Sequence, residues 1–549
     1  MNNYKILTVV ITFLFLFSET CFSQETASRE SHIKNRTLSE YYHQRIPSVV
    51  LYNEKPLGNS GLHSMPWELN RLRPYKNELT ELVDRINTKD YTAWINTAWA
   101  VMEMKTGIVP ENTIAPLAEA LLKYWENPEE NYKKGELESF LFSQSGEEVA
   151  NYLRIARTQP SMKQQMQVRP NLTKLIIEID DFLQILLELA ERSKDVVMPG
   201  YTHIRHAQPT TFGHYILSVY DPVWRSLKTL ENGYYDMSKN ELGCGALAGT
   251  SWPIDRDLVS RYLACDGLIE NTNDAVAHTD EYVVLVAGLS NISAVLSRLG
   301  ADLDYWSGRE YNFIDFEIGA GSFMMPNKRS NQTYFESTYI SSAHMIGVLT
   351  GLATMGIRLP HGDMNAQAYN MAPPTLEAIQ IVNFLVNQLL YHFPRMTLKK
   401  DVMLAATRAG GSTSTELANE ISRRFKIDPR TGHYIVNRFV NLQEAQKGTL
   451  TDYTQADIKV FQLAAKEVLG HELDLSQADL TRLLDPVHFV EITNSKGGVA
   501  PTEVSRMIAD RWVQLDAARQ RHTDLIKNEE SAKKQMLADL EALYHAHKK

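Results

Sequence analysis

The chain contains little cysteine: Cys21, Cys244 and Cys265 are the three cysteines among 549 residues. So few thiols cannot form a disulfide framework, and the fold must depend on burial of the apolar residues, which make up 44% of the sequence. We expect Cys244 and Cys265 to be buried free thiols, with a single bridge between them as the alternative. Lipidation of Cys21 is a weaker hypothesis, because the preceding Ser-Glu-Thr fits a lipidation motif poorly.

Clusters of basic residues are also missing, and the formal net charge is −10. This balance argues against a nucleic-acid-binding surface. A small anionic substrate is still compatible with it, since a local cationic pocket needs no basic surface. The Cys, His and Asp residues have no spacing that supports a metal site. We therefore expect a small-molecule substrate, and neither a metal nor a cofactor.

Long, purely apolar runs are rare. Residues 6–17 form one, apart from two threonines; Lys5 precedes it, and Cys21-Phe-Ser23 follows with small outer residues. This arrangement is typical of a cleavable secretory signal over residues 1–23, and the run is too short to span a bilayer comfortably. An uncleaved anchor is the alternative. We expect no later stretch to cross a membrane, so we predict a secreted or periplasmic mature protein.

Alternating strand patterns are nearly absent, and from residue 76 onward apolar residues recur at helical spacing. The longest helical patterns cover residues 172–189, 213–230, 282–306, 336–352, 376–392 and 503–549. The central patterns are apolar on wide faces, which predicts an all-α bundle shared between subunits. The chain length favours several domains. We expect an N-terminal helical domain over residues 24–157, a central long-helix bundle over 158–399 and a C-terminal helical domain over 400–549.

Three glycine-bearing segments interrupt the helical patterns. They are residues 199–209 (PGYTHIRHAQP), 243–249 (GCGALAG) and 319–331 (GAGSFMMPNKRSN). Loops at helix ends expose backbone N–H groups next to the positive ends of helix dipoles. Such loops are suited to binding an anion, which makes these segments candidate parts of a site.

Together these segments resemble the fumarase/aspartase superfamily, and its argininosuccinate lyase branch in particular. The matching blocks, in the order expected for that branch, are residues 200–203, 207–214, 245–249, 253–256, 273–276, 297–302 and 319–331. The similarity is specific over residues 195–345, weak before them and vague after residue 400. The resemblance implies a three-domain fumarase/aspartase-like fold with a central bundle of long helices. It also implies a homotetramer in which three subunits build each active site.

The reaction implied by the resemblance is an anti elimination that releases fumarate or a close analogue. A base removes a C–H proton next to a carboxylate, negative charge builds into that carboxylate, and an acid protonates the leaving group. The resemblance assigns the base to Ser322, whose anion Lys328 and backbone N–H groups would stabilise. It assigns proton delivery to His203, with Glu336 orienting the ring. The candidate site consists of catalytic Ser322, His203 and Glu336, with substrate-binding Thr202, Lys328, Asn331 and Gln208.

Other polar residues fit the family pattern less well. His206 and His214 have no comparable role, and we interpret them as structural polar groups. Phe323 stands where the family has a second serine, and one residue is inserted between Lys328 and Asn331.

Two substrate-binding blocks also depart from the family. The first block, expected near residue 155, reads RIARTQP over residues 154–160, where Arg157 and Thr158 are poor substitutes. Residues 359–367 (LPHGDMNAQ) lack the tyrosine and lysine that hold the arginine half of the substrate in the family. The resemblance therefore implies that the elimination apparatus is retained and that the leaving-group pocket is rebuilt.

We interpret the sequence as a carbon–nitrogen lyase that acts on an N-substituted aspartate or succinyl compound. Argininosuccinate itself is not favoured, and carbon–oxygen elimination or lactonising isomerisation stay open. The rival hypothesis is a non-catalytic secreted relative that binds a dicarboxylate or is purely structural. Phe323 and the inserted residue support the rival, whereas the presence of Ser322, Lys328, His203 and Glu336 together opposes it.

Overall fold

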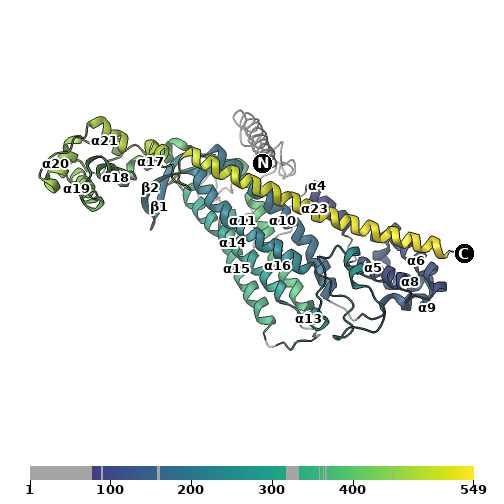
Figure 1. Ribbon diagram of the computed structural model, residues 1–549. Helices are drawn as coiled ribbons and strands as arrows, with labels where there is room; N and C mark the ends of the chain where they lie inside the picture. The colour runs from purple at the N-terminus through teal and green to yellow at the C-terminus, as the bar shows by residue number, and fades with distance from the viewer. Residues whose placement is uncertain are drawn as a thin grey trace, which may run out of the picture.

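The computed structural model describes residues 77–87, 91–157, 161–316, 333–357, 359–362, 364, 368–448 and 450–548. The molecule is elongated and almost wholly helical, with a helical lobe at each end of a long-helix bundle (Figure 1). The all-α fold predicted from the sequence is therefore confirmed.

In the described part of the chain, five long helices form the central bundle. They are α10 (Ser161–Arg192), α11 (Phe212–Met237), α14 (Asp280–Ser307), α15 (Thr333–Met355) and α16 (Ala368–His392). Helix α10 packs on α11 and α16, and α14 packs on α11, α15 and α16. Leu183, Tyr220 and Leu289 are fully buried in the shared core. Each large apolar side chain buried in this way contributes roughly 1.5–3 kcal/mol, so the bundle is the main source of stability.

Helix α14 corrects one prediction. We expected no membrane-crossing stretch after residue 23, yet α14 is long and apolar enough by length and composition to cross a bilayer. In the structure 56% of that apolar window is buried inside the protein. The helix is apolar on several faces because it has helical neighbours on several sides.

The N-terminal lobe consists of short helices around a separate core that includes Trp99 and Leu121. Its elements are α4 (Glu78–Ile86), α5 (Tyr91–Lys105), α6 (Glu111–Glu126), α7 (Pro128–Lys134), α8 (Leu137–Ser145), α9 (Glu147–Ala150) and the 3-10 turn η2 (Asn151–Arg154). Two later helices, α12 (Arg256–Tyr262) and α13 (Thr272–Ala277), follow the bundle helix α11. Helix α12 packs on α5, so the chain returns to this lobe before α14.

The C-terminal lobe has its own core around Leu417, Phe439 and Phe461. Its elements are α17 (Lys400–Ala409), α18 (Ser414–Phe425), α19 (Pro429–Lys447), η4 (Tyr453–Gln455), α20 (Ile458–Leu469), α21 (Gln477–Leu483) and α22 (Pro486–Ile492). Two small antiparallel sheets lie at the same end of the molecule. They are β1 (Val197–Thr202) with β2 (Arg205–Thr211), and β3 (Ile314–Phe316) with β4 (Met396–Leu398), the latter preceded by η3 (Phe393–Arg395).

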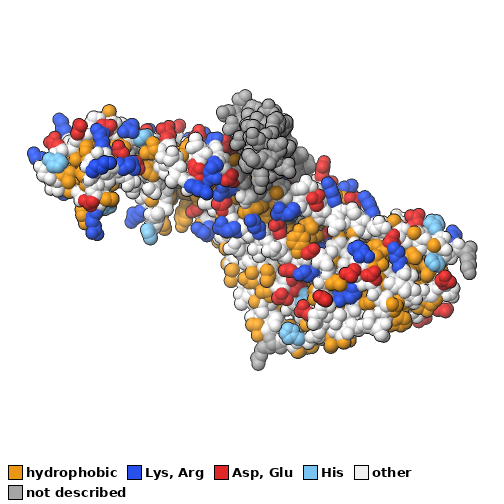
Figure 2. Space-filling view, in the orientation of Figure 1, with side chains coloured by type: hydrophobic (Ala, Val, Ile, Leu, Met, Phe, Trp, Pro, Cys, Tyr) orange, Lys and Arg blue, Asp and Glu red, His pale blue; other side chains and the backbone are white. Residues whose placement is uncertain are grey.

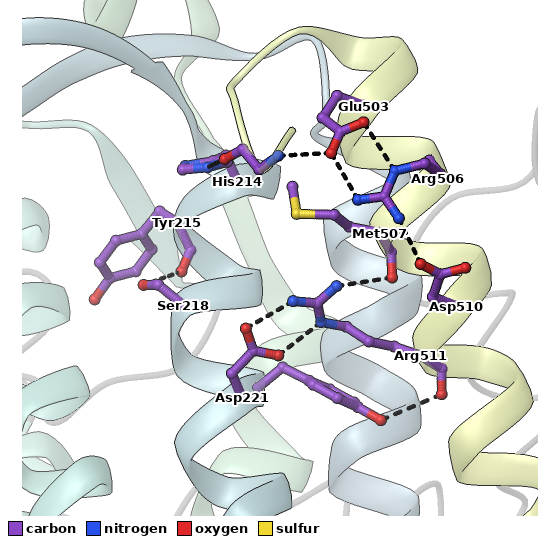
Figure 3. Close-up of polar contacts among 11 residues, drawn as sticks. His214, Tyr215, Ser218, Asp221, Glu503, Arg506, Met507, Asp510 and Arg511 are labelled. Carbon is purple, nitrogen blue, oxygen red and sulfur yellow. Dashed lines mark hydrogen bonds and ion pairs between the residues drawn. The ribbon is translucent and has the colours of Figure 1, made fainter. Parts of the chain in front are cut away.

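The last helix, α23 (Pro501–His547), connects the two ends of the molecule. It begins beside the C-terminal lobe, runs along the bundle and ends on the N-terminal lobe (Figure 1). Near its start Arg511 donates two hydrogen bonds to Asp221 of α11, at 2.7 and 2.6 Å (Figure 3). Near its end Asp539 pairs with Lys105 of α5. The predicted domain boundaries at residues 157 and 399 stay predictions.

His522, in the middle of α23, makes the stability of this helix dependent on pH. Its ring lies 2.6 Å from Asp180 and 2.8 Å from Glu231. Burial lowers its pKa, but the two carboxylates outweigh burial and raise the pKa to about 9. The stabilisation is therefore complete below pH 6.5 and is lost as the pH rises through about 9.

We expect the free energy of unfolding to fall between pH 6.5 and 9, by on the order of 3 kcal/mol from this group. His522→Gln should show a smaller fall, because glutamine does not titrate. Urea unfolding followed by circular dichroism at several pH values measures both slopes. Equal slopes in the two proteins would assign the pH dependence to other groups.

Candidate active site

The segment over residues 199–209, expected as a loop, is an antiparallel hairpin. Strands β1 and β2 pair as far as Thr202 and Arg205, with an irregular register beside Gly200. A Cβ added to Gly200 would lie 2.5 Å from the carbonyl oxygen of Gln208. The glycine of this block is therefore required for the close approach of the two strands.

The turn of the hairpin consists of His203 and Ile204, which both adopt left-handed backbone angles, with φ of 52° and 59°. Two-residue turns of this hand favour Asn-Gly, and a β-branched residue such as Ile204 is strained in them. Ile204 is 83% exposed, so packing within the chain does not compensate for the strain. Strained residues cluster at functional sites, and here the strain falls on the predicted catalytic histidine and its neighbour.

Aromatic contacts connect the hairpin to the start of α15. Tyr201 contacts Tyr311 with ring centroids 6.1 Å apart, and Tyr311 contacts Phe313, just before β3, at 5.6 Å. At the end of β3, Phe316 contacts Tyr334, in the first turn of α15, at 6.0 Å. Phe316 and Tyr334 flank the predicted signature segment in the sequence. Both flanks of that segment therefore lie at the hairpin end of the bundle.

The structure describes four of the seven predicted site residues. Thr202, His203 and Gln208 are exposed on the hairpin, and Glu336 is exposed in the first turn of α15. Among the residues that the structure describes, His203 and Glu336 share no hydrogen bond or ion pair within the chain. The other three predicted residues, Ser322, Lys328 and Asn331, lie outside the described residues.

The second glycine segment, residues 243–249, lies at the opposite end of the bundle. Glu241, two residues before it, approaches His278, which lies two residues before the start of α14. The other end of α14 reaches the hairpin, because Tyr305 contacts Tyr311. A helix of 28 residues spans about 42 Å. Within one chain, the second segment and the hairpin are thus separated by approximately the length of α14.

A buried polar cluster at this far end was not found from the sequence. Nε2 of His278 lies 3.2 Å from Glu281, 3.7 Å from Glu241 and 3.1 Å from the amide of Gln165. Burial lowers the pKa of His278, but Glu281 and Glu241 outweigh it and raise the pKa to about 10. The ring is therefore a fixed cation at neutral pH. Two of its partners, Glu241 and Gln165, come from distant parts of the chain, so periodicity in the sequence cannot reveal the cluster.

Arg157, the weak substitute for the family's first block, lies next to the glycine segment over residues 243–249. The backbone of Arg157 forms an isolated parallel β-bridge with Gly245 in the glycine segment. Its guanidinium carbon lies 5.8 Å from the centroid of the Trp99 ring. Burial raises the pKa of neighbouring Glu103 to about 8, although the charge of Arg157 opposes the shift. This end of the bundle therefore combines a cation with a carboxyl group that titrates close to neutral pH.

The sequence predicts that Cys244 and Cys265 are free thiols, and the structure agrees. Cys244 and Cys265 are free, and burial raises their pKa values to about 11 and about 12, so neither is a reactive thiolate at neutral pH. Among the described residues, no group of three or more His, Cys, Asp and Glu side chains is arranged to hold a metal ion.

Known proteins with similar sequences are lyases. Residues 158–347 match a family model described as lyase. The chain is 29% identical over 458 residues to the argininosuccinate lyase of Methanosarcina barkeri, which covers 81% of this chain and 91% of that protein. It is 27% identical over 401 residues to argininosuccinate lyase 1 of Shouchella clausii, covering 72% of this chain and 80% of the relative.

Solved structures share the fold. An EDDS lyase variant with bound fumarate has a TM-score of 0.74 at 24% identity, over 86% of this chain and 97% of that one. A class II fumarase from Schistosoma mansoni has a TM-score of 0.58 at 13% identity, over 77% and 96%. The long-helix bundle with a lobe at each end is thus the fold of fumarase-type lyases. The chain is therefore similar to argininosuccinate lyases in sequence, and residues 158–347 match the lyase family model.

Proposed function

We propose that this protein is a carbon–nitrogen lyase that eliminates fumarate, or a close analogue, from an N-substituted aspartate or succinyl compound. The observation that carries the proposal is the strained turn at His203. It lies at the end of the bundle to which both flanks of the signature segment are joined. The names of the similar proteins, and the fumarate bound to one solved neighbour, support the reaction class.

The proposed chemistry divides the reaction between two faces of the substrate. Ser322 takes the C–H proton, while Lys328 and Asn331 stabilise the charge that develops on the adjacent carboxylate. On the opposite face His203 delivers a proton to the departing nitrogen, and Thr202 donates a hydrogen bond to the substrate. The leaving group differs from that of argininosuccinate, because residues 359–367 lack the tyrosine and lysine of the family.

We further propose that the sites are completed in a homotetramer. Within one described chain, His203 and Glu336 share no hydrogen bond or ion pair, and residues 243–249 lie about the length of α14 away from the hairpin. Helix α15 exposes Ile340 and Ile346, each 53% exposed. Figure 2 shows hydrophobic and uncharged side chains over α14 and α15, where charged groups are sparse. A second copy that covers this face would bury the apolar side chains and bring opposite ends of different chains together.

Substitution of Ile340 and Ile346 by glutamate together should break this assembly. Buried carboxylates without partners are costly, so we expect a smaller species and a parallel loss of turnover. Size-exclusion chromatography with light scattering measures the mass. Tyr434→Glu is a matched control, because Tyr434 is 54% exposed but lies on the C-terminal lobe. An unchanged mass in the double variant would contradict the proposed interface.

The lyase proposal is tested by incubating the mature protein with fumarate and a panel of amines, and separately with argininosuccinate. Fumarate absorbance follows the reaction in both directions. Turnover that is lost in Ser322→Ala supports the lyase. Absence of turnover across the panel, with dicarboxylate binding unaltered in Ser322→Ala, would support the non-catalytic alternative.

We also propose that residues 1–23 are a cleaved export signal and that the mature protein is secreted or periplasmic. These residues lie outside the part of the chain that the structure describes. Mass spectrometry of the protein recovered from its natural host tests the proposal. A first residue after Ser23 supports it, and an intact N-terminus contradicts it.

A further inference from the structure

One face of strand β2 is directed toward the C-terminal part of the chain. His206, Gln208 and Thr210 alternate along the strand, so their side chains lie on the same face. Each of these three side chains either contacts a residue beyond position 400 or contacts another side chain that does. The two strands of the hairpin are also packed by α17 and α22 of the C-terminal lobe.

The first contact depends on the absence of a side chain at Gly410, which follows α17. The ring of His206 packs edge-on against Tyr201, with centroids 5.2 Å apart. A Cβ at residue 410 would lie 1.7 Å from Nδ1 of His206 and 2.6 Å from Cγ. Gly410 has a φ of −82°, which any residue adopts, so the glycine is required by the space that the ring occupies.

The other two contacts are polar. Nε2 of Gln208 donates to the hydroxyl of Thr415, in the first turn of α18, at 3.4 Å. The hydroxyl of Thr210 lies 3.4 Å from Nδ1 of His214, and Nε2 of that ring donates to the carbonyl of Gly497 at 3.0 Å. Figure 3 shows His214 beside the start of α23.

The turn at Gly497 is held from its other side as well. Its N–H donates to Glu503 at 2.6 Å, and Arg506 donates to the same carboxylate at 2.9 Å (Figure 3). The turn whose carbonyl accepts the hydrogen bond of His214 is therefore itself bonded to the start of α23.

We propose that the C-terminal lobe sets the position of His203 through this face of β2, with Gly410 as the main positioning residue. His203 and Ile204 are exposed at the end of the hairpin. The position of this turn relative to the bundle therefore depends on the contacts that hold strands β1 and β2. The catalytic consequence rests on the proposed function, in which His203 delivers a proton. The positioning itself does not require turnover and is tested separately.

The first test measures position without activity. Spin labels on cysteines placed at Ile204 and at exposed Ser218 of α11 report the distance from hairpin turn to bundle, in labelled chains diluted with unlabelled chains. Gly410→Ala should shift this distance by about 2 Å, since a 1.7 Å approach must relax to an ordinary contact of about 3.5 Å. Adding His206→Ala to Gly410→Ala should restore the original distance. An unchanged distance in Gly410→Ala would overturn the proposal, whatever the activity.

The second test measures turnover in the chain without labels. Gly410→Ala should lower kcat at least about tenfold with a smaller effect on KM, because misplacement by about 1 Å can cost 10²-fold. The double variant that combines Gly410→Ala with His206→Ala should have the same kcat as His206→Ala alone. A distance shift in a chain that shows no turnover at all would retain the positioning and reject the lyase. A distance shift with unchanged kcat in an active enzyme would overturn the role for His203.

A milder variant covers the case in which Gly410→Ala does not fold. Thr415→Val keeps the shape of an exposed side chain but removes the acceptor for Gln208. It should shift the spin-label distance in the same direction by a smaller amount. No shift in this variant, together with an unfolded Gly410→Ala, would also count against the proposal.

Discussion

His203→Asn is expected to reduce turnover by roughly 10²–10⁴-fold while leaving the fold intact, because general acid catalysis contributes an effect of that size. Asparagine adopts left-handed backbone angles more readily than most residues, and His203 has a φ of 52°. The side chain is exposed, so its replacement removes little packing. We therefore expect an equal or slightly higher melting temperature. Fumarate absorbance and thermal unfolding, measured on the same preparation, check both parts.

Ile204→Gly is the matched control for this turn. Glycine relieves the strain of a β-branched residue at φ 59°, which should raise the melting temperature, and His203 is retained. We expect its turnover to exceed that of His203→Asn. Full turnover in His203→Asn would exclude the histidine from the reaction. A large loss of thermal stability in that variant would instead assign His203 a structural role.

Glu529→Leu is expected to lower the free energy of unfolding by about 3–5 kcal/mol, since it leaves a buried charge without its partner. Glu529 accepts a hydrogen bond from Arg169 at 2.9 Å, and the two side chains are 3% and 2% exposed. The hydroxyl of Tyr234 donates to the same carboxylate at 2.7 Å. These contacts join α23 to α10 and α11. Chemical unfolding at neutral pH measures the loss.

Two further variants separate charge burial from packing. Arg169→Met combined with Glu529→Leu should recover most of the stability, because apolar groups of similar volume replace the buried pair. Glu530→Gln removes the partner of Lys534 on the same helix, but these side chains are 35% and 72% exposed. We expect that change to cost less than about 1 kcal/mol. An equal loss in Glu529→Leu and Glu530→Gln would contradict the role of burial.

The sequence alone determined the helices and the order of the motifs. The pattern over residues 172–189 lies inside α10, and that over 336–352 lies inside α15. Such patterns depend on residues three or four positions apart, so local spacing is enough to identify them. The resemblance through the Gly-Tyr-Thr-His block likewise needed only neighbouring residues, and the lyase family model that matches residues 158–347 agrees with it.

Tertiary structure alone decided how these pieces are arranged. The block around His203 forms a hairpin rather than a loop, because β2 pairs with β1 and packs on the C-terminal lobe. His206 meets Gly410, and His278 meets Glu241, only after distant segments pack together. The separation of residues 243–249 from the hairpin follows from the length of α14. Contacts between residues far apart in the chain depend on how whole helices pack. The spacing of residues along the sequence does not predict such contacts.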